Sequence, residues 1–362
     1  EKDAVYCYHF YHLIQRAKNV FLIYNTEPDV LLGGEKSRFI SQLEIEQIHD
    51  IEHIIVSPNI LPPEKKLKSV KKTLQVNNTL QEVAEKGFSP SSLSTYIRNP
   101  LDFYYQKVLG IKEYDDVEEV VAANTLGTIV HNTLEDFYKP LEGKMLNSEM
   151  LLSMKSRVEN TVSKHFSEVY KKGQIDKGKN LIIYEVAKRY VINFLNAELN
   201  LIKKGHSIKI LNIEVENHVA INVSGLNFPV FLTGKVDRID MFDGVTRIID
   251  YKTGKVDSTQ VQIVDWEDIT SDYKKYSKSF QVLMYAYMLN QQGSLKFPVE
   301  AGIISFKNLN KGFLKFGKKE SSKSRIKDCM IAKETLDCFS KELKKLILEI
   351  NNPEIPFEEK EV

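Results

Sequence analysis

The sequence has few cysteines, no long apolar run and almost no net charge. Its three cysteines among 362 residues, Cys7, Cys329 and Cys338, form no Cys-x-x-Cys pair, which excludes a disulfide framework and favours a reducing, cytoplasmic setting. No stretch approaches the roughly 18 apolar residues of a membrane span, and no signal peptide is visible. Because 50 Lys and Arg balance 49 Asp and Glu, a uniformly basic DNA-coating protein is excluded, but a local basic groove is not.

A nucleotide-binding loop is also missing. No Gly-x-x-x-x-Gly-Lys-Ser/Thr sequence occurs, since Gly34-Glu-Lys-Ser37 has the wrong spacing, and we expect no ATP site in this chain. The first residue is Glu1 rather than Met, so we expect a piece of a longer protein. Hydrophobic residues make up 42% and charged residues 27%, an ordinary folded composition that excludes disorder.

The chain divides into three segments. Residues 1–56 alternate between helix and strand, with strands at 20–24 and 51–56, and predict an α/β fragment. Residues 57–87 carry prolines and a basic run and predict a solvated linker, with contact to nucleic acid as the alternative. Residues 88–362 predict one larger α/β domain.

Apolar periodicity sets the elements of this larger domain. Helices are expected over 93–108, 124–138, 148–172, 181–204, 279–290 and 324–350. Strands are expected over 208–216, 230–241, 246–252 and 299–306, with a polar loop over 253–278 that is long enough to guide a strand of substrate.

One hairpin places two carboxylates face to face. Asp243-Gly244 between two strands is a strong signal for a two-residue turn. In that register Asp240 faces Arg247. Asp237 then faces Asp250, with Cβ atoms about 4.5–5.5 Å apart.

Two carboxylates so close repel each other, so we expect a divalent cation with oxygen ligands to compensate them. Lys252 lies two residues beyond Asp250 and points to the same face. The alternative is a surface hairpin with ordinary charges, but flanking residues such as Val236 and Ile248 indicate a half-buried hairpin. The pattern therefore predicts a metal site.

Asp237 in Gly-Lys-Val-Asp-Arg-Ile-Asp, followed by Asp250-Tyr-Lys252, resembles the PD-(D/E)xK nuclease superfamily. It is most similar to the RecB/AddB-type nuclease domain of bacterial helicase–nucleases. Further motifs of that group occur in order over about residues 88–350. They are Gly127, His131 and Glu135 on one helix, Glu214 on a strand, and Gln281 with Tyr285 on a later helix.

The resemblance implies a mixed central sheet flanked by helices, a restriction-endonuclease-like core with a helical insertion. It implies Mg²⁺ or Mn²⁺ bound by His131, Asp237, Asp250 and the carbonyl of Tyr251. Lys252 would position the attacking water or stabilise the transition state.

The remaining motif residues have less defined expected roles. Glu214 would bind the metal through water or orient the nucleophile, with Glu216 as its competitor. Glu135 and Gly127 would support the site from outside the ligand shell, or Glu135 would simply lie on the surface. Gln281 and Tyr285 would contact the scissile strand or position the lysine, with helix packing as the alternative.

The expected activity is that of a Mg²⁺- or Mn²⁺-dependent deoxyribonuclease, an exonuclease rather than an endonuclease, acting in DNA repair and recombination. One alternative is a catalytically silent DNA-binding or scaffold module. Another is a structural Ca²⁺ site, which has no need of the ammonium of Lys252.

Gln15-Arg-Ala-Lys18 resembles the last motor motif of superfamily 1 helicases, with Gln15 in place of Thr. Residues 1–56 would then be the tail of a helicase-like domain. Its missing portion, and a second helicase–nuclease subunit, are the expected protein partners. Asn99 in Tyr96-Ile-Arg-Asn-Pro100 stands where many relatives have the first cysteine of an iron–sulfur cluster, so no cluster is expected.

DNA binding needs positive surface. The candidates in the polar loop are Lys274, Lys275 and Lys278, with Tyr273 and Tyr276 as possible stacking platforms for bases. Near the last strand the candidates are Lys311, Lys315, Lys318, Lys319, Lys323 and Arg325.

Overall fold

The computed structural model describes residues 2–25, 36–56, 67–111, 123–170, 177–324 and 326–360. The chain divides into two compact units, residues 1–65 and residues 66–362. The expected loop at residues 33–34, the prolines at 58–63 and the candidate Arg325 lie outside the described residues. None of the described helices is long and apolar enough to cross a membrane.

The N-terminal unit contains two helices, α1 (Lys2–Ile14) and α2 (Arg38–Glu46). Both were expected, but the strands predicted at 20–24 and 51–56 are wrong, because neither segment is a strand. Phe21 is 84% exposed and Ile23 95% exposed. A strand forms only against a hydrogen-bonded partner, and the described part of this unit offers none.

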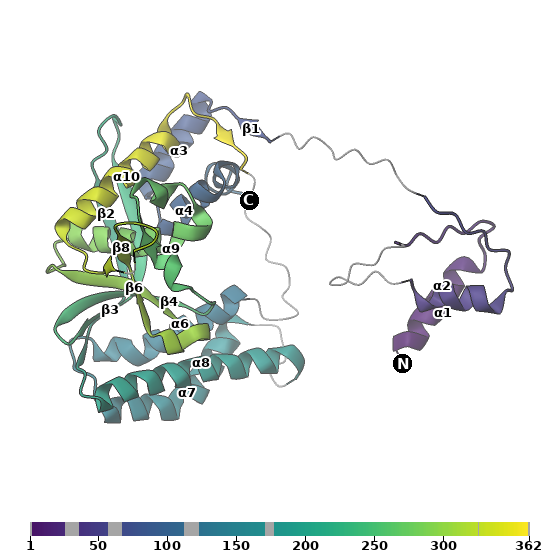
Figure 1. Cartoon of the computed structure of the whole chain (residues 1–362), viewed down its shortest axis with the longest axis horizontal. Helices are drawn as coiled ribbons and strands as arrows, with labels where there is room; N and C mark the ends of the chain where they lie inside the picture. The colour runs from purple at the N-terminus through teal and green to yellow at the C-terminus, as the bar shows by residue number, and fades with distance from the viewer. Residues whose placement is uncertain are drawn as a thin grey trace. The chain divides into compact units, whose positions relative to one another are not determined.

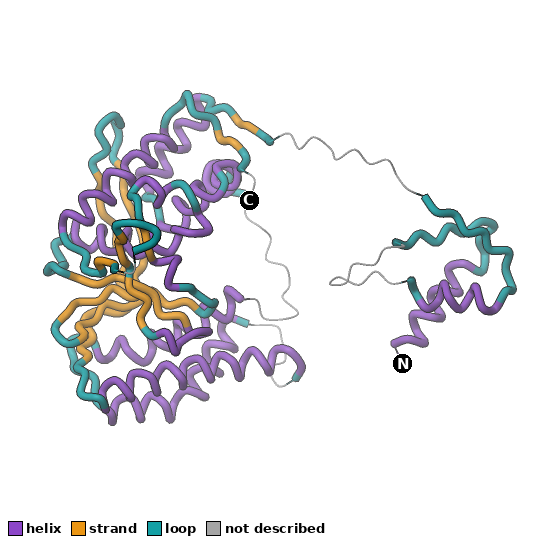
Figure 2. The backbone as a smooth tube through the Cα atoms, in the orientation of Figure 1, coloured by secondary structure: helices purple, strands orange, loops and turns teal. Residues whose placement is uncertain are grey.

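The larger unit is built on a five-stranded sheet in the order β2-β3-β4-β6-β7 (Figures 1 and 2). Its strands are β2 (Ile208–Ile221), β3 (Val230–Phe242), β4 (Val245–Lys252), β6 (Val299–Ser305) and β7 (Phe313–Lys315). The pair β4–β6 is parallel and the other pairs are antiparallel. Helices flank this mixed sheet, as the expected restriction-endonuclease-like fold requires.

Each face of the sheet has its own apolar core. On one face lie α6 (Ala123–Tyr138), α7 (Ser148–Val169) and α8 (Gly178–Lys203), which form the expected helical insertion. On the other face lie α3 (Leu74–Lys86), α4 (Pro90–Arg98), α9 (Tyr273–Gln291) and α10 (Lys333–Asn351) (Figure 1). The short elements are β1 (Ser69–Val70), α5 (Pro100–Phe103), a π-helical turn (Tyr104–Val108), β5 (Gln262–Ile263), β8 (Gly317–Lys319), β9 (Lys327–Asp328) and β10 (Phe357–Glu358).

The prediction of a solvated linker is wrong for the part that forms α3. Val76, Leu80 and Ala84 recur at the spacing of one helix face and are buried in the main core. Thr73 caps the helix by accepting a 3.4 Å hydrogen bond from the Val76 amide. The linker was predicted from the prolines and lysines before α3, which are typical of solvated segments, and not from the apolar spacing that follows them.

Three predicted boundaries are also wrong. The helix expected over 93–108 breaks at Pro100, which has no amide hydrogen to continue it. Helix α9 begins at Tyr273 rather than 279, because Asp272 caps it. The last helix begins at Lys333 rather than 324, because residues 327–328 form β9 in a small sheet with β5 and β8.

The hairpin has the predicted register. Phe242 pairs with Val245, and Asp240 faces Arg247. Asp243 and Gly244 have φ of 49° and 88°, and positive φ at both central residues is what a type I′ turn requires. The turn therefore sets which side chains reach each face of β3 and β4.

Candidate metal centre

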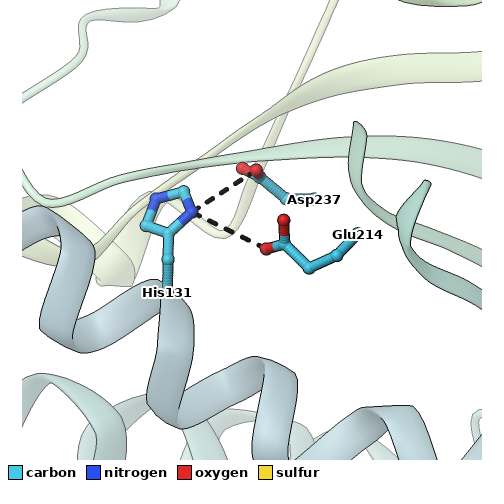
Figure 3. A group of neighbouring side chains, drawn as sticks. All are labelled: His131, Glu214 and Asp237. Atoms are coloured by element: carbon cyan, nitrogen blue, oxygen red, sulfur yellow. Dashed lines mark ion pairs between the residues drawn. The ribbon is translucent and has the colours of Figure 1, made fainter. Parts of the chain in front are cut away.

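Three side chains from three elements meet at one end of the sheet. His131 on α6, Glu214 on β2 and Asp237 on β3 each offer a ligand atom, and these atoms lie within 4.8 Å of one another (Figure 3). His131 Nδ1 is 3.3 Å from Asp237 Oδ1 and 4.0 Å from Glu214 Oε1. One imidazole nitrogen and two carboxylates form a donor set that suits a divalent cation.

Glu214 reaches this cluster through an unusual backbone conformation. Its φ is +54° in the middle of β2, a left-handed conformation that a side chain other than that of glycine adopts at a cost of about 1–3 kcal/mol. Glu216, its competitor in the sequence, is exposed on the same strand. The structure therefore brings Glu214, not Glu216, to the candidate ligands.

The peptide of Tyr251 lies between two of the candidate ligands. Its amide donates a 2.6 Å hydrogen bond to Asp237 Oδ2, and its carbonyl oxygen is 3.2 Å from His131 Nε2. A carbonyl only accepts hydrogen bonds, so Nε2 donates to it. The approach of Nδ1 to the carboxylates requires either a second proton on Nδ1 or a cation between these groups. In this arrangement the Tyr251 carbonyl orients His131, whereas the sequence resemblance expected it to bind the metal itself.

The cluster carries excess negative charge. Burial lowers the pKa of His131, but the hydrogen bond and charge of Asp237, with the charges of Asp250 and Glu214, raise it above its usual value overall. Burial raises the pKa of Glu214, against the lowering effect of Lys235. Bringing a positive charge among these groups is therefore favourable, whether it is a proton or a metal ion.

Asp250 adjoins this cluster, although its carboxylate already has two partners. The pairing of β3 with β4 runs as far as Arg238 and Ile249, one step before Asp237 and Asp250. Asp250 is 2% exposed, and its Oδ2 is 2.6 Å from Lys252 Nζ. Burial raises the pKa of Asp250.

Lys252 stays charged in this setting. Burial lowers its pKa, but Asp250 and Asp237 outweigh this effect and raise the pKa above its usual value. An ammonium at this place can neutralise an anionic oxygen, and it is a poor general base. Of the two roles expected from the sequence, stabilisation of charge fits this setting better.

Helix α9 contacts the site through one face. Gln281 donates 2.9 Å hydrogen bonds from Nε2 to Asp250 Oδ1 and to the hydroxyl of Tyr285. Tyr285 is 6% exposed, and burial raises its pKa, as do the charges of Asp250 and Asp237. Packing and contact with the site, which the sequence left as alternatives, occur together here.

Glu135 lies one step away from the candidate ligands. It is 2.6 Å from Lys139 and 3.7 Å from Lys235. Lys235 is in turn 2.7 Å from Glu214. Sequence reasoning missed Lys235, although its place two residues before Asp237 puts it on the same strand face.

Among the described residues, no close neighbour requires glycine at position 127. A Cβ at this position would meet only Thr253 Oγ1, at an ordinary contact distance of 3.7 Å. A close approach occurs at Gly234, where a Cβ would lie 2.8 Å from Met288 Cε and 3.4 Å from Tyr285 Cε1. This small residue in β3 therefore lets α9 pack against the sheet beside the site.

The DNA-binding candidates are distributed differently from the prediction. Lys274, Lys275 and Lys278 lie on the first turns of α9 instead of a loop. Burial, together with the charge of Lys252, lowers the pKa of Lys278, which places this lysine near the site. Tyr276 is wrong as a stacking platform, because it is 3% exposed and its hydroxyl donates to Asp268.

Three of the candidates near the last strands have acidic or backbone partners. Lys311 is 3.1 Å from Asp257, and Lys315 pairs with Glu300. Lys318 donates to the carbonyl of Val264. A lysine that already pairs with a carboxylate attracts phosphate less strongly, so the lysines of α9 are the better candidates.

A family model described as "PD-(D/E)XK nuclease superfamily" matches residues 87–361. Curated relatives include uncharacterized proteins of Rickettsia bellii, 22% identical over 200 residues, and of Rickettsia felis, 23% identical over 179 residues. A third, from Rickettsia conorii, is 24% identical over 170 residues. These matches cover 51%, 46% and 46% of this chain but only 21%, 19% and 19% of the relatives.

Proposed function

Because the chain belongs to the PD-(D/E)XK nuclease superfamily, we propose that it hydrolyses DNA phosphodiester bonds with the help of Mg²⁺ or Mn²⁺. The observation that carries this proposal is the meeting of His131, Glu214 and Asp237 within 4.8 Å, next to the Asp250–Lys252 pair. Phosphodiester hydrolysis at such a site needs a cation, a charged lysine and room for a phosphate.

The donor set fits such a cation. Three buried or half-buried carboxylates face one imidazole, and a divalent ion would relieve their mutual repulsion. His131, Asp237 and Glu214 would hold it, with Asp250 adjacent and the Tyr251 carbonyl orienting the imidazole. When bound, the cation would polarise the phosphodiester and lower the pKa of a bound water.

The remaining residues act on the substrate and on the carboxylates. Lys252 stabilises negative charge that develops on the phosphate oxygens in the transition state. Gln281 fixes the Asp250 carboxylate, and Tyr285 fixes Gln281 in turn. The lysines at the start of α9, Lys274, Lys275 and Lys278, contact the DNA backbone.

The wider assignment rests on the sequence resemblance to the RecB/AddB type. On this assignment the chain is the C-terminal part of a cytoplasmic helicase–nuclease for DNA repair and recombination, and it acts as an exonuclease. Residues 1–56 belong to a helicase-like domain whose remaining portion is a partner of the nuclease domain. A second helicase–nuclease subunit completes the complex.

The alternative function is a catalytically silent module that binds DNA or serves as a scaffold. The short ion pair between Asp250 and Lys252 speaks against this alternative. A non-catalytic fold gains little stability from a buried ion pair, because desolvation offsets the attraction of the charges.

The test is degradation of labelled single- and double-stranded DNA by the full chain with Mg²⁺ or Mn²⁺. Asp250→Ala and Lys252→Ala should each abolish cutting while the protein remains folded. Asp337→Ala and Lys333→Ala, exposed positions on α10, are the matched controls and should cut normally. Unchanged cutting by the Asp250 variant would refute the site, and a parent chain that neither cuts DNA nor binds metal would favour the silent module.

A further inference from the structure

Tyr251 connects the candidate metal centre to the apolar core between the sheet and helices α6 and α8. Its backbone contacts Asp237 and His131, as described above. Its side chain points away from that of Asp250, because successive side chains of a strand point to opposite faces. The ring is 2% exposed, and its centroid is 5.9 Å from that of His131. The ring packs edge-on against Phe194 of α8, with centroids 5.5 Å apart.

Arg238 contacts the hydroxyl of this ring and is completely buried. Its Nη1 is 3.4 Å from the Tyr251 hydroxyl. Its Nη2 is 2.8 Å from Glu198 Oε1 and 2.7 Å from Asp240 Oδ2. Because Arg238 directly follows Asp237 in β3, the same short stretch of strand carries a candidate ligand on one face and this guanidinium on the other.

The cluster extends to the helices of the insertion. Glu198 is on α8, and the hydroxyl of Tyr138 on α6 donates to it. The Arg238 guanidinium also lies over the Tyr138 ring, 4.8 Å from its centroid. Tyr138 and His131 are seven residues apart on α6, so they share one face of that helix.

Stability alone is a weak reason for such a cluster. Removing two arginines and two carboxylates from water costs several kcal/mol per ion, and apolar side chains of similar volume often serve a fold equally well. A buried ionic group does fix geometry, because its hydrogen-bond partners must keep their places. Arg238 follows Asp237 in β3 and contacts the Tyr251 hydroxyl on β4. Its contacts therefore hold the strand of Asp237 and the strand of Tyr251 in place.

We propose that Arg238, held by Glu198, is a positioning residue for the metal centre, because it fixes the Tyr251 ring and with it the peptide between Asp237 and His131. This inference rests on the proposed function. It adds a residue that touches neither the metal ligands' donor atoms nor the substrate. The affinity of the protein for the cation therefore measures the positioning role of Arg238.

Arg247 provides a matched control in the same cluster. It is an arginine of similar burial, 7% exposed, and it donates two 2.8 Å hydrogen bonds to Asp240. Among the hydrogen bonds and ion pairs of the described residues, Arg247 makes none with Glu198 or Tyr251. Lysine at either position keeps the charge but loses the planar, two-point contact of a guanidinium.

The experiment compares Arg238→Lys with Arg247→Lys in the full chain. Mn²⁺ affinity is measured by calorimetry, DNA cutting is resolved into kcat and KM, and melting temperature reports folding. Arg238→Lys should weaken Mn²⁺ binding by about 10–100-fold and lower kcat with it. Arg247→Lys should lose stability without this change, and in both variants KM should stay nearly constant.

Two further variants keep the test decisive if Arg238→Lys does not fold. Glu198→Gln removes the charge that holds Arg238, and Tyr251→Phe removes the hydroxyl without the ring, and each should show a smaller loss of Mn²⁺ affinity. Equal loss in the Arg238 and Arg247 variants, or full Mn²⁺ affinity in folded Arg238→Lys, would overturn the proposal. A parent chain that neither binds Mn²⁺ nor cuts DNA would instead refute the proposed function.

Discussion

The side-chain amide of Gln281 donates a 2.9 Å hydrogen bond to Oδ1 of Asp250, and so joins α9 to the end of β4. The same nitrogen contacts the hydroxyl of Tyr285. Asp250 has a rigid partner on each oxygen, because Lys252 lies against Oδ2. The orientation of this carboxylate is thus set by two neighbouring elements.

Removing this amide should slow the reaction without unfolding the domain. We expect Gln281→Ala to lower kcat by about 10–100-fold, the usual effect of losing a partner that orients a catalytic carboxylate. Gln291→Ala, at the exposed end of the same helix, should cut DNA at the parental rate. Kinetics of DNA degradation with saturating Mn²⁺ measure both variants, and equal rates would exclude a role for Gln281.

Divalent metal should stabilise the folded protein through the His131 cluster. At a free Mn²⁺ concentration 100 times Kd, the free energy of unfolding should rise by about 2.7 kcal/mol, because only the folded state assembles the site. His131→Ala should lose most of this increment, and a chelator should remove it from the parent. Thermal unfolding with and without Mn²⁺ measures the effect. An increment retained in the variant would place the bound metal elsewhere.

Gly302 in β6 should not tolerate alanine. A Cβ there would lie 2.2 Å from the carbonyl oxygen of Leu314 on β7, and backbone atoms cannot move aside as a flexible side chain can. Gly302→Ala should destabilise the protein by about 2–3 kcal/mol, at the upper end of overpacking effects. Gly254→Ala has no atom within 4 Å of the new Cβ and serves as control. Urea unfolding of both variants should show the difference.

Because of Lys72, the free energy of unfolding should increase with pH on the alkaline side. Burial lowers its pKa from 10.5 to about 8. Between these values the unfolded chain binds more protons than the folded one, so the free energy of unfolding increases as pH rises above about 8. Its ammonium donates to the carbonyls of Glu349 and Asn352, which moderates the effect.

The matched variant for this effect is Lys72→Met, which keeps the length of the side chain without the charge. Its free energy of unfolding should change less steeply between pH 7 and about 9.5 than that of the parent chain. Parallel curves for the two proteins in chemical unfolding would contradict the burial effect on this lysine.

The hairpin and its register were predictable because a two-residue turn fixes every pair that follows it. Asp240 and Arg247 face each other as expected. The motif spacing likewise selected His131, Glu214 and Asp237, which the fold brings together. These predictions needed only local geometry and the order of motifs.

Other features depend on tertiary contacts that no single segment reveals. In the sequence, Glu198 is an ordinary acidic residue of a predicted helix. Its role becomes visible only in the fold, where α8 brings it to Arg238. The left-handed conformation of Glu214 has no signal in the sequence, because glycine or asparagine usually marks such a position. Charged residues and prolines around α3 favour a linker in the sequence, although the helix has an apolar face. Asp272 is a recognisable N-cap, and it indicates the observed start of α9 better than the apolar pattern does.

The short strands β1 and β10 stand at the two ends of the larger unit and pair with each other. Ser69 pairs with Glu358 and Val70 with Phe357, so paired Cα atoms lie about 4.5–5.5 Å apart. The Asn99 side chain holds this end further by accepting from the amides of Leu101 and Lys360. Chain entry and chain exit therefore occupy one spot on the unit, a geometry that suits circular permutation and transplantation of the unit into a surface loop of another protein.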